Sequence, residues 1–278
     1  MGTSPDGDFL LYFNLRDGVL APWEISTMTM EIQQKLLTLL TPAAAALDVD
    51  TVRIGLGYTA VRLGDGATGL AWTPPPSAGC CTHMNCAGTL AGRSAEELLN
   101  NLVDEHPLRR AVGLATANAL LASRPHPQAS TIDALEPLAV TDRDHVAMVG
   151  YFGPLVRDLK QIGCRLDIIE LNSIHSETLS PEAGRAVLAA CDVAILTGTS
   201  LVTGTIDDLL ASLGRPRAAV LLGPSSPFCP QAFAGTPLTQ ISGARVIDSE
   251  GVLRVVSEAG GTPLLKPYVA FETVPIRV

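Results

Sequence analysis

From Asp142 onward, short apolar runs alternate with amphipathic stretches, and this alternation restricts the fold more than any other feature of the sequence. Strands and helices that alternate at this spacing form right-handed βαβ units, and such units build a parallel sheet. We therefore predict that 142–278 is a Rossmann-like α/β domain. The predicted strands are His145–Gly150, Arg165–Leu171, Val193–Thr197, Ala218–Leu222 and Gly243–Ile247, and the predicted helices are Pro154–Ile162, Pro181–Ala190 and Ile206–Leu213.

The first half of the chain lacks this alternation. Apolar residues at a helical period predict a helix over Pro22–Leu40, and a second helix is expected over Leu108–Ala122. Three short runs with a period of two predict an antiparallel meander, with strands through Val52–Leu56, Val61–Leu63 and Gly69–Thr73. Ser94 followed by Glu97 has the spacing of a capping box and predicts a further helix start. The predicted N-terminal unit is a small α+β domain over 1–122.

Proline residues mark the boundary between the two predicted domains. Pro125, Pro127 and Pro137 fall within a polar stretch, where they prevent a continuous helix. We assign 123–141 to a linker. A chain of 278 residues, 47% of them apolar, is long enough to fill two cores.

The charge balance and the apolar runs exclude several classes of partner. The formal net charge is −9 and no basic stripe occurs, so nucleic acid is not an expected partner. The start of the chain has no cationic segment ahead of an apolar one, and the apolar run Leu36–Leu47 is too short to cross a bilayer. We expect a soluble, cytoplasmic protein with no membrane contact. A monomer and a homodimer both remain open.

A glycine turn joins the first predicted strand of the second domain to its helix. Gly150 and Gly153 flank Tyr151 and Phe152, and amides at the start of the following helix would favour an anion. Glu170 follows the next predicted strand, where an acidic side chain often binds a ribose hydroxyl. The full G-x-G-x-x-G pattern of dinucleotide sites is absent, so a tight turn without a ligand is the competing interpretation.

Two more polar loops follow predicted strands of the same sheet. The first runs from Thr197 to Thr205 and the second from Gly223 to Pro227. Because parallel strands end at one edge, the three loops are expected to converge there and form a ligand site. The candidate residues in these two loops are Thr197, Gly198, Thr199, Ser200, Thr203, Gly223, Pro224, Ser225 and Ser226.

A cysteine-rich segment is a separate candidate for metal binding. Cys80, Cys81, His83 and Cys86 lie within seven residues, and thiolates with imidazole are the ligands that Zn²⁺ and similar transition metals prefer. No second ligand pair completes a structural zinc site, so cysteines without a metal are the alternative. The identity of any transition metal stays open.

The three loops together resemble the DUF364 family, which is named for heavy-metal chelation. The residues that carry the resemblance are Val149–Val156, Glu170, Thr197–Thr205 and Gly223–Pro227. The first half resembles the accompanying DUF4213 domain at Ile54–Gly57, Leu90–Arg93 and Gly113–Leu120. The resemblance implies an enolase-N-terminal-like domain packed on a Rossmann-like domain, with a shared cleft that binds a metal or a metal chelate.

Three functions are compatible with these features. The first is a metal-binding or chelate-binding protein of metal homeostasis or cofactor handling, with Asn118 and Glu170 as polar partners of the ligand between the domains. The second is an enzyme that acts on a small anionic substrate or a nucleotide-type ligand in the same cleft. The third is a non-catalytic assembly module with the cleft blocked by Tyr151 and Phe152. The sequence does not decide whether the protein is an enzyme.

Overall fold

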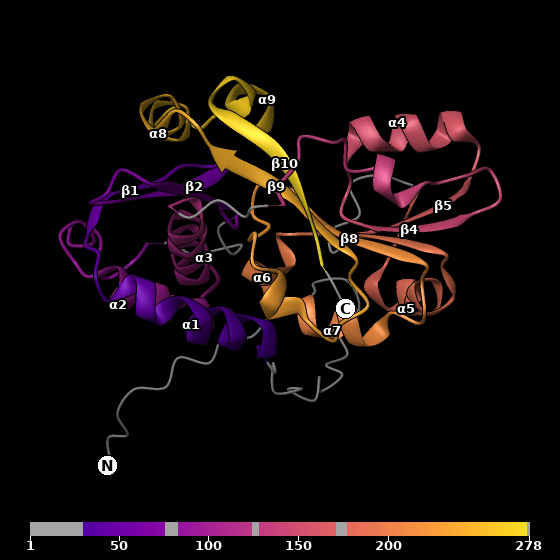
Figure 1. Ribbon diagram of the computed structural model, residues 1–278, viewed down its shortest axis with the longest axis horizontal. Helices are drawn as coiled ribbons and strands as arrows, with labels where there is room; N and C mark the ends of the chain where they lie inside the picture. Colours follow the sequence, from indigo (N-terminus) through magenta and orange to yellow (C-terminus); the bar gives the residue numbers. More distant parts are fainter. Residues whose placement is uncertain (1–29, 76–82, 124–127, 171–176, 277–278) are drawn as a thin grey trace, which may run out of the picture.

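Two β-sheets organise the chain in the computed structural model, which describes residues 30–75, 83–123, 128–170 and 177–276. The first half forms a three-stranded antiparallel sheet, and the second half forms a seven-stranded sheet that is parallel except at one edge (Figure 1). The predicted combination of a Rossmann-like sheet and an N-terminal meander with helices is confirmed.

The small sheet has the order β1-β2-β3. Its strands are β1 (Val49–Ile54), β2 (Tyr58–Leu63) and β3 (Thr68–Trp72), and its helices are α1 (Glu31–Ala44), α2 (Ala95–Leu99) and α3 (Pro107–Ala122), with a 3-10 turn η1 (Asn100–Val103). The predicted cap is present, because the Ser94 hydroxyl accepts a hydrogen bond from the Glu97 amide at 3.2 Å. A capped start of this kind satisfies one of the amides that a helix leaves unpaired.

Two sequence-based boundaries in this half differ from the structure. The predicted helix spans Pro22–Leu40, of which 22–29 lie outside the described residues, and the observed helix α1 begins at Glu31 and continues to Ala44. The amides of Glu31 and Ile32 bond to the carboxylate of Asp207, a contact across the fold that no local pattern reveals. The first predicted strand stops at Ile54, and Leu56, expected on its buried face, is 81% exposed in the hairpin turn.

The large sheet has the order β10-β9-β8-β7-β4-β5-β6. All neighbours pair in parallel except β9 and β10. Its strands are β4 (His145–Val149), β5 (Arg165–Ile169), β6 (Thr178–Leu179), β7 (Val193–Thr197), β8 (Ala218–Leu222), β9 (Gln240–Val246) and β10 (Val269–Pro275). Sequence patterns did not predict β6 or β10, since one has two residues and the other returns antiparallel without a preceding long helix.

Helices cover both faces of the large sheet. α4 (Gly153–Ile162) lies on one face with the 3-10 turn η2 (Glu136–Leu138), and α5 (Pro181–Ala190), α6 (Ser200–Thr203) and α7 (Ile206–Ser212) lie on the other (Figure 1). The remaining elements after β8 are η3 (Pro230–Phe233), α8 (Ser249–Ser257), α9 (Thr262–Leu265) and η4 (Lys266–Tyr268). No helix in the described part of the chain combines the length and apolar character that crossing a bilayer requires.

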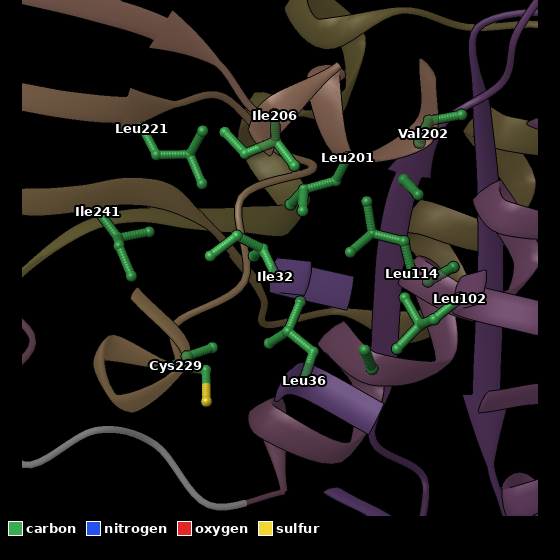
Figure 2. Packing of buried hydrophobic residues seen from close by; sticks show 14 of the residues in the cluster. Ile32, Leu36, Leu102, Leu114, Leu201, Val202, Ile206, Leu221, Cys229 and Ile241 are labelled. Carbon is green, nitrogen blue, oxygen red and sulfur yellow. The ribbon is translucent and has the colours of Figure 1, made fainter. Parts of the chain in front are cut away.

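One apolar core joins the two halves of the chain. Ile32 and Leu36 of α1 lie between Leu221 and Ile241 of the large sheet on one side and Leu114 of α3 on the other (Figure 2). A second contact is made by α8, whose buried valines pack with Tyr58 and Leu70 of the small sheet. The division of the chain into two domains with a linker at 123–141 stays a prediction. The apolar core contains residues from both sides of this linker.

Candidate functional site

The strand order of the large sheet reverses direction between β4 and β7. The chain leaves β4 through α4 toward β5 on one side, and it leaves β7 through α6 and α7 toward β8 on the other. Connections that diverge in this way leave a crevice at the carboxyl ends of the two strands, which is where open α/β sheets bind ligands.

A cavity of about 370 Å³ lies at this position. That volume falls within the range of small-molecule pockets. Its walls come from the ends of β4, β5 and β7, from α5, α6 and α7, and from the last residue of β3. The lining residues are Trp72, Val149, Gly150, Ile169, Glu170, Pro181, Arg185, Leu188, Thr197, Thr199, Ser200, Thr203, Thr205, Asp208, Leu209 and Ser212. The predicted candidates in this set are Gly150, Glu170, Thr197, Thr199, Ser200 and Thr203.

The Gly150 turn brings the ends of β4 and β7 close together. Gly150 has φ +89°, in the left-handed region where glycine is favoured, and its amide donates to the Ile169 carbonyl at 2.9 Å. A Cβ atom added there would lie 3.1 Å from the Thr197 Cβ atom. The absence of a side chain at Gly150 therefore allows its main chain to lie close to Thr197 at this end of the pocket.

The hydroxyl groups of the second loop bond mostly to the loop itself. Ser200 donates to the Thr197 carbonyl at 2.7 Å and is 1% exposed, so it supports the loop from below. The hydroxyls of Thr197 and Thr199 lie 3.1 Å apart, and those of Thr203 and Thr205 lie 2.9 Å apart. These pairs present oxygen atoms to the pocket in a fixed arrangement.

The third predicted loop lies beside the pocket and does not line it. The Ser225 hydroxyl accepts a hydrogen bond from the Trp72 amide at 2.8 Å, and the Asn118 amide group donates to the carbonyls of Leu70 and Ser225. Ser225 and Asn118 therefore tie the end of β3 to the loop after β8. A ligand contact for either residue stays a prediction.

Close packing also joins the second and third loops. A Cβ atom on Gly198 would lie 2.6 Å from the Ser226 Oγ atom, so only glycine fits without a shift. The Ser226 hydroxyl is buried and has no hydrogen-bond partner in the described structure. Ser226 lies against Gly198 and is not among the residues that line the cavity of about 370 Å³.

The remaining predicted binding residues lie near the pocket, outside its lining. Tyr151 is 40% exposed, and Phe152 packs against the apolar cluster under α4. Gly153 is the first residue of α4. Gly223 has φ +114°, close to the Phe152 ring, and Pro224 follows it. A ligand role for these residues stays a prediction, as does a cleft blocked by the two aromatic rings.

Three of the described residues that line the pocket are charged, and two of these are acidic. Among the described residues, the carboxylates of Glu170 and Asp208 make no hydrogen bond or ion pair, and Arg185 on α5 is exposed at the mouth. An ionised carboxylate only accepts hydrogen bonds. The pocket thus carries an excess of acceptor groups.

Sequence reasoning missed Trp72, Arg185, Asp208 and Ser212, and it included Thr205 only as the end of the second loop. Trp72 ends β3, and only the three-dimensional packing brings it to the other sheet. Thr205, Asp208 and Ser212 recur every three or four residues along α7, a polar stripe that helical periodicity could have revealed. Arg185 carried no comparable signal.

The cysteine-rich segment is only partly described. Cys80 and Cys81 lie outside the described residues, His83 is exposed and Cys86 is half-buried against the main core. Within the described ranges, no group of three or more His, Cys, Asp or Glu side chains could hold a metal ion. Burial raises the pKa of the thiols of Cys164, Cys191 and Cys229, which favours the neutral form that metals do not bind.

Comparison with known proteins identifies two matching families. Residues 133–275 match the DUF364 model and residues 38–121 match the DUF4213 model, both described as "Putative heavy-metal chelation". The sequence is 26% identical over 246 residues to the uncharacterized protein MJ0500 of Methanocaldococcus jannaschii, covering 85% of this chain and 93% of that protein.

Two crystal structures of DUF364 proteins of unknown function have the same fold. The protein from Pyrococcus horikoshii superposes with a TM-score of 0.78 at 22% identity, over 88% of this chain and 99% of the other. The protein from Desulfitobacterium hafniense gives a TM-score of 0.77 at 24% identity, over 91% and 100%. At these identities the likeness extends to the fold alone.

Proposed function

The chain belongs to the DUF364 family, and from this premise we propose that it binds a metal chelate in the pocket between β4 and β7, in metal homeostasis or cofactor handling. The observation that carries the proposal is the preformed cavity of about 370 Å³, with hydroxyl, carboxylate and aromatic side chains in its wall. A pocket of this size admits an organic ligand as well as a metal ion.

The donor groups favour a chelate over a bare ion. Among the described residues, the pocket lining contains no cysteine or histidine, and its two carboxylates come from different places, directly after β5 and on α7. Soft transition metals prefer thiolate and imidazole ligands. A metal that enters already bound by an organic ligand needs only hydrogen bonds and apolar contacts from the protein, and these groups are present.

The competing function, an enzyme for a small anionic substrate, has weaker support. The Ser200 and Thr203 hydroxyls can donate to main-chain carbonyls of their own loop, an arrangement that holds the loop and does not activate a nucleophile. Catalysis in this pocket remains a prediction from sequence.

The test is analysis of protein purified without an affinity tag from cells grown with added transition metals. We expect native mass spectrometry to detect an adduct whose mass includes one metal and one organic molecule, and elemental analysis to find the same metal near one equivalent. Trp72→Ala should reduce the adduct, and Cys86→Ser should leave it unchanged. Metal content near zero for all transition metals, with no organic adduct, would refute the proposal.

A further inference from the structure

Several amides of the glycine loops around the pocket already donate hydrogen bonds within the protein. The amides of Gly150, Gly198 and Thr205 donate to carbonyls of the protein, at 2.8–2.9 Å. The amide of Thr199 donates to the Thr197 hydroxyl, and that of Thr203 to the Thr199 carbonyl. The start of α4 lies outside the pocket lining. A phosphate cradle needs several amides that point to the ligand, and these amides are already used.

Glu170 provides a hydrogen-bond acceptor, whereas a phosphate site needs hydrogen-bond donors. It follows β5, whose neighbour β4 forms one side of the crevice, and its carboxylate lines the cavity without a partner among the described residues. A carboxylate has two oxygens side by side, and both accept hydrogen bonds. Two hydroxyl groups on adjacent carbons can donate to both oxygens at once, and an acidic side chain at this place in a Rossmann-like sheet commonly binds a ribose in that way.

The rest of the pocket is consistent with an uncharged ligand. Among the described lining residues, two carboxylates against one exposed arginine give a net negative charge, which disfavours a phosphate or carboxylate group on the ligand. Trp72 adds a flat aromatic wall from the small sheet. Such a ring can stack on a planar base or contact the apolar face of a sugar.

We propose that Glu170 binds a vicinal diol on an uncharged ligand, as the ribose of a nucleoside or a plain sugar would provide, with the ligand body against Trp72. The inference rests on the proposed binding role of the same pocket and names the chemistry of the organic part. The proposed ligand is therefore uncharged, in place of the small anion that the glycine turn predicted.

Isothermal titration calorimetry of the full chain tests the proposal with four probes: adenosine, 2′-deoxyadenosine, AMP and methyl β-D-ribofuranoside. We expect adenosine to bind about tenfold more tightly than 2′-deoxyadenosine, because the deoxy compound leaves one carboxylate oxygen without a donor. AMP should bind no more tightly than adenosine. Binding of the riboside comparable to adenosine assigns the diol to a sugar, and much weaker riboside binding assigns it to a nucleoside.

Variants separate a direct contact from a structural effect. Glu170→Ala should weaken adenosine binding about tenfold and abolish the preference over 2′-deoxyadenosine, since both changes remove the same interaction. Asp158→Ala, at an exposed acidic residue on α4 outside the pocket lining, is the matched control and should behave as the unaltered protein. Retention of the full preference in Glu170→Ala would overturn the assignment.

Three other results would also overturn it: equal affinity for adenosine and 2′-deoxyadenosine, AMP binding tenfold tighter than adenosine, or no binding of any probe at millimolar concentration. Native mass spectrometry on the same preparations distinguishes this failure from failure of the proposed function. If a metal-containing adduct is found but adenosine and 2′-deoxyadenosine bind equally, the chelate function stands and the diol assignment is wrong. If adenosine binds more tightly than 2′-deoxyadenosine but no metal-containing adduct is found, the diol site is supported and the chelate function is refuted.

Discussion

At the amino ends of the parallel strands charged side chains pair with one another, whereas at the carboxyl ends two carboxylates have no partner among the described residues. Asp144 accepts hydrogen bonds from Arg217 at 2.7 Å and from the Thr141 amide at 2.6 Å, and the His145 Nε2 atom lies 2.7 Å from the Asp167 carboxylate. Glu170 and Asp208 at the other end line the pocket. One edge pairs its charges within the fold, whereas the carboxylates at the other edge are free to take part in the proposed ligand binding.

The largest effect is expected where the loops of the carboxyl edge pack most tightly. Gly198→Ala would place a Cβ atom 2.8 Å from the Ser226 amide nitrogen, which is main chain and cannot move alone. We expect a loss of about 3 kcal/mol in the free energy of unfolding, measured by urea denaturation with circular dichroism. Gly64→Ala is the control, since its Cβ would meet nothing closer than 3.5 Å. Equal stability of the two variants would show that the loops are not rigid.

The next largest loss of stability is expected from the hydrogen bond that joins the small sheet to the loop after β8. Ser225→Ala removes the acceptor of the Trp72 amide and should cost about 1–2 kcal/mol of unfolding free energy. Ser226→Ala removes a buried hydroxyl without a hydrogen-bond partner in the described structure and should change stability by less than about 0.5 kcal/mol. The same denaturation assay compares the two neighbouring serines, and a reversed order would contradict the assigned roles.

A smaller, pH-dependent effect is expected at the amino edge. The hydrogen bond from Arg217 lowers the pKa of Asp144 from 3.8 to about 2. A carboxyl group with a lowered folded-state pKa stabilises the fold above its unfolded-state pKa, and this stabilisation is lost as the pH falls from about 4 to about 2. Because the Arg217 side chain is 43% exposed and partly screened, we expect Asp144→Asn to cost about 1 kcal/mol at pH 7.

The difference between Asp144→Asn and the unaltered protein should shrink below pH 4, followed as unfolding free energy against pH. Asp158→Asn, at an exposed position on α4, serves as the control and should show no such change. A difference that stays constant down to pH 2 would exclude the ionised pair as its cause.

The smallest effect on stability is expected for the carboxylates of the pocket. Glu170→Gln and Asp208→Asn should each change the unfolding free energy by less than about 0.5 kcal/mol, because neither carboxylate has a partner among the described residues. Thermal and urea denaturation of the ligand-free protein check this. A loss above about 1 kcal/mol in either variant would remove the contrast between the two edges.

The sequence predicted the parallel sheet well because its periodicity is local. The bounds of α5, β7 and β8 agree with the predicted Pro181–Ala190, Val193–Thr197 and Ala218–Leu222. β7 and β8 are short continuous apolar runs, α5 is amphipathic, and a proline or glycine stands at or next to one end of each. Patterns of this kind can be recognised within a short segment, without knowledge of the rest of the chain.

Contacts across the fold were not predictable in this way. Trp72 reaches the pocket because Ser225 and Asn118 hold the end of β3, and these partners lie 153 and 48 residues away from their contacts in β3. The same serine and asparagine were expected to bind the ligand, since a polar side chain gives the same sequence signal whether it contacts a ligand or the main chain. The chain position of Glu170, directly after a strand, was enough to identify it as a candidate.

The packing of α8 against β2 has a consequence for the order of events during synthesis. Tyr58 and Leu70 are buried by side chains from a helix that begins at Ser249, which is synthesised long after β2 and β3. The meander therefore emerges long before its covering helix and needs protection from aggregation in the interval. Trp72 reaches its final place only after the loop beyond β8 has emerged, so a nascent chain has no complete pocket to load.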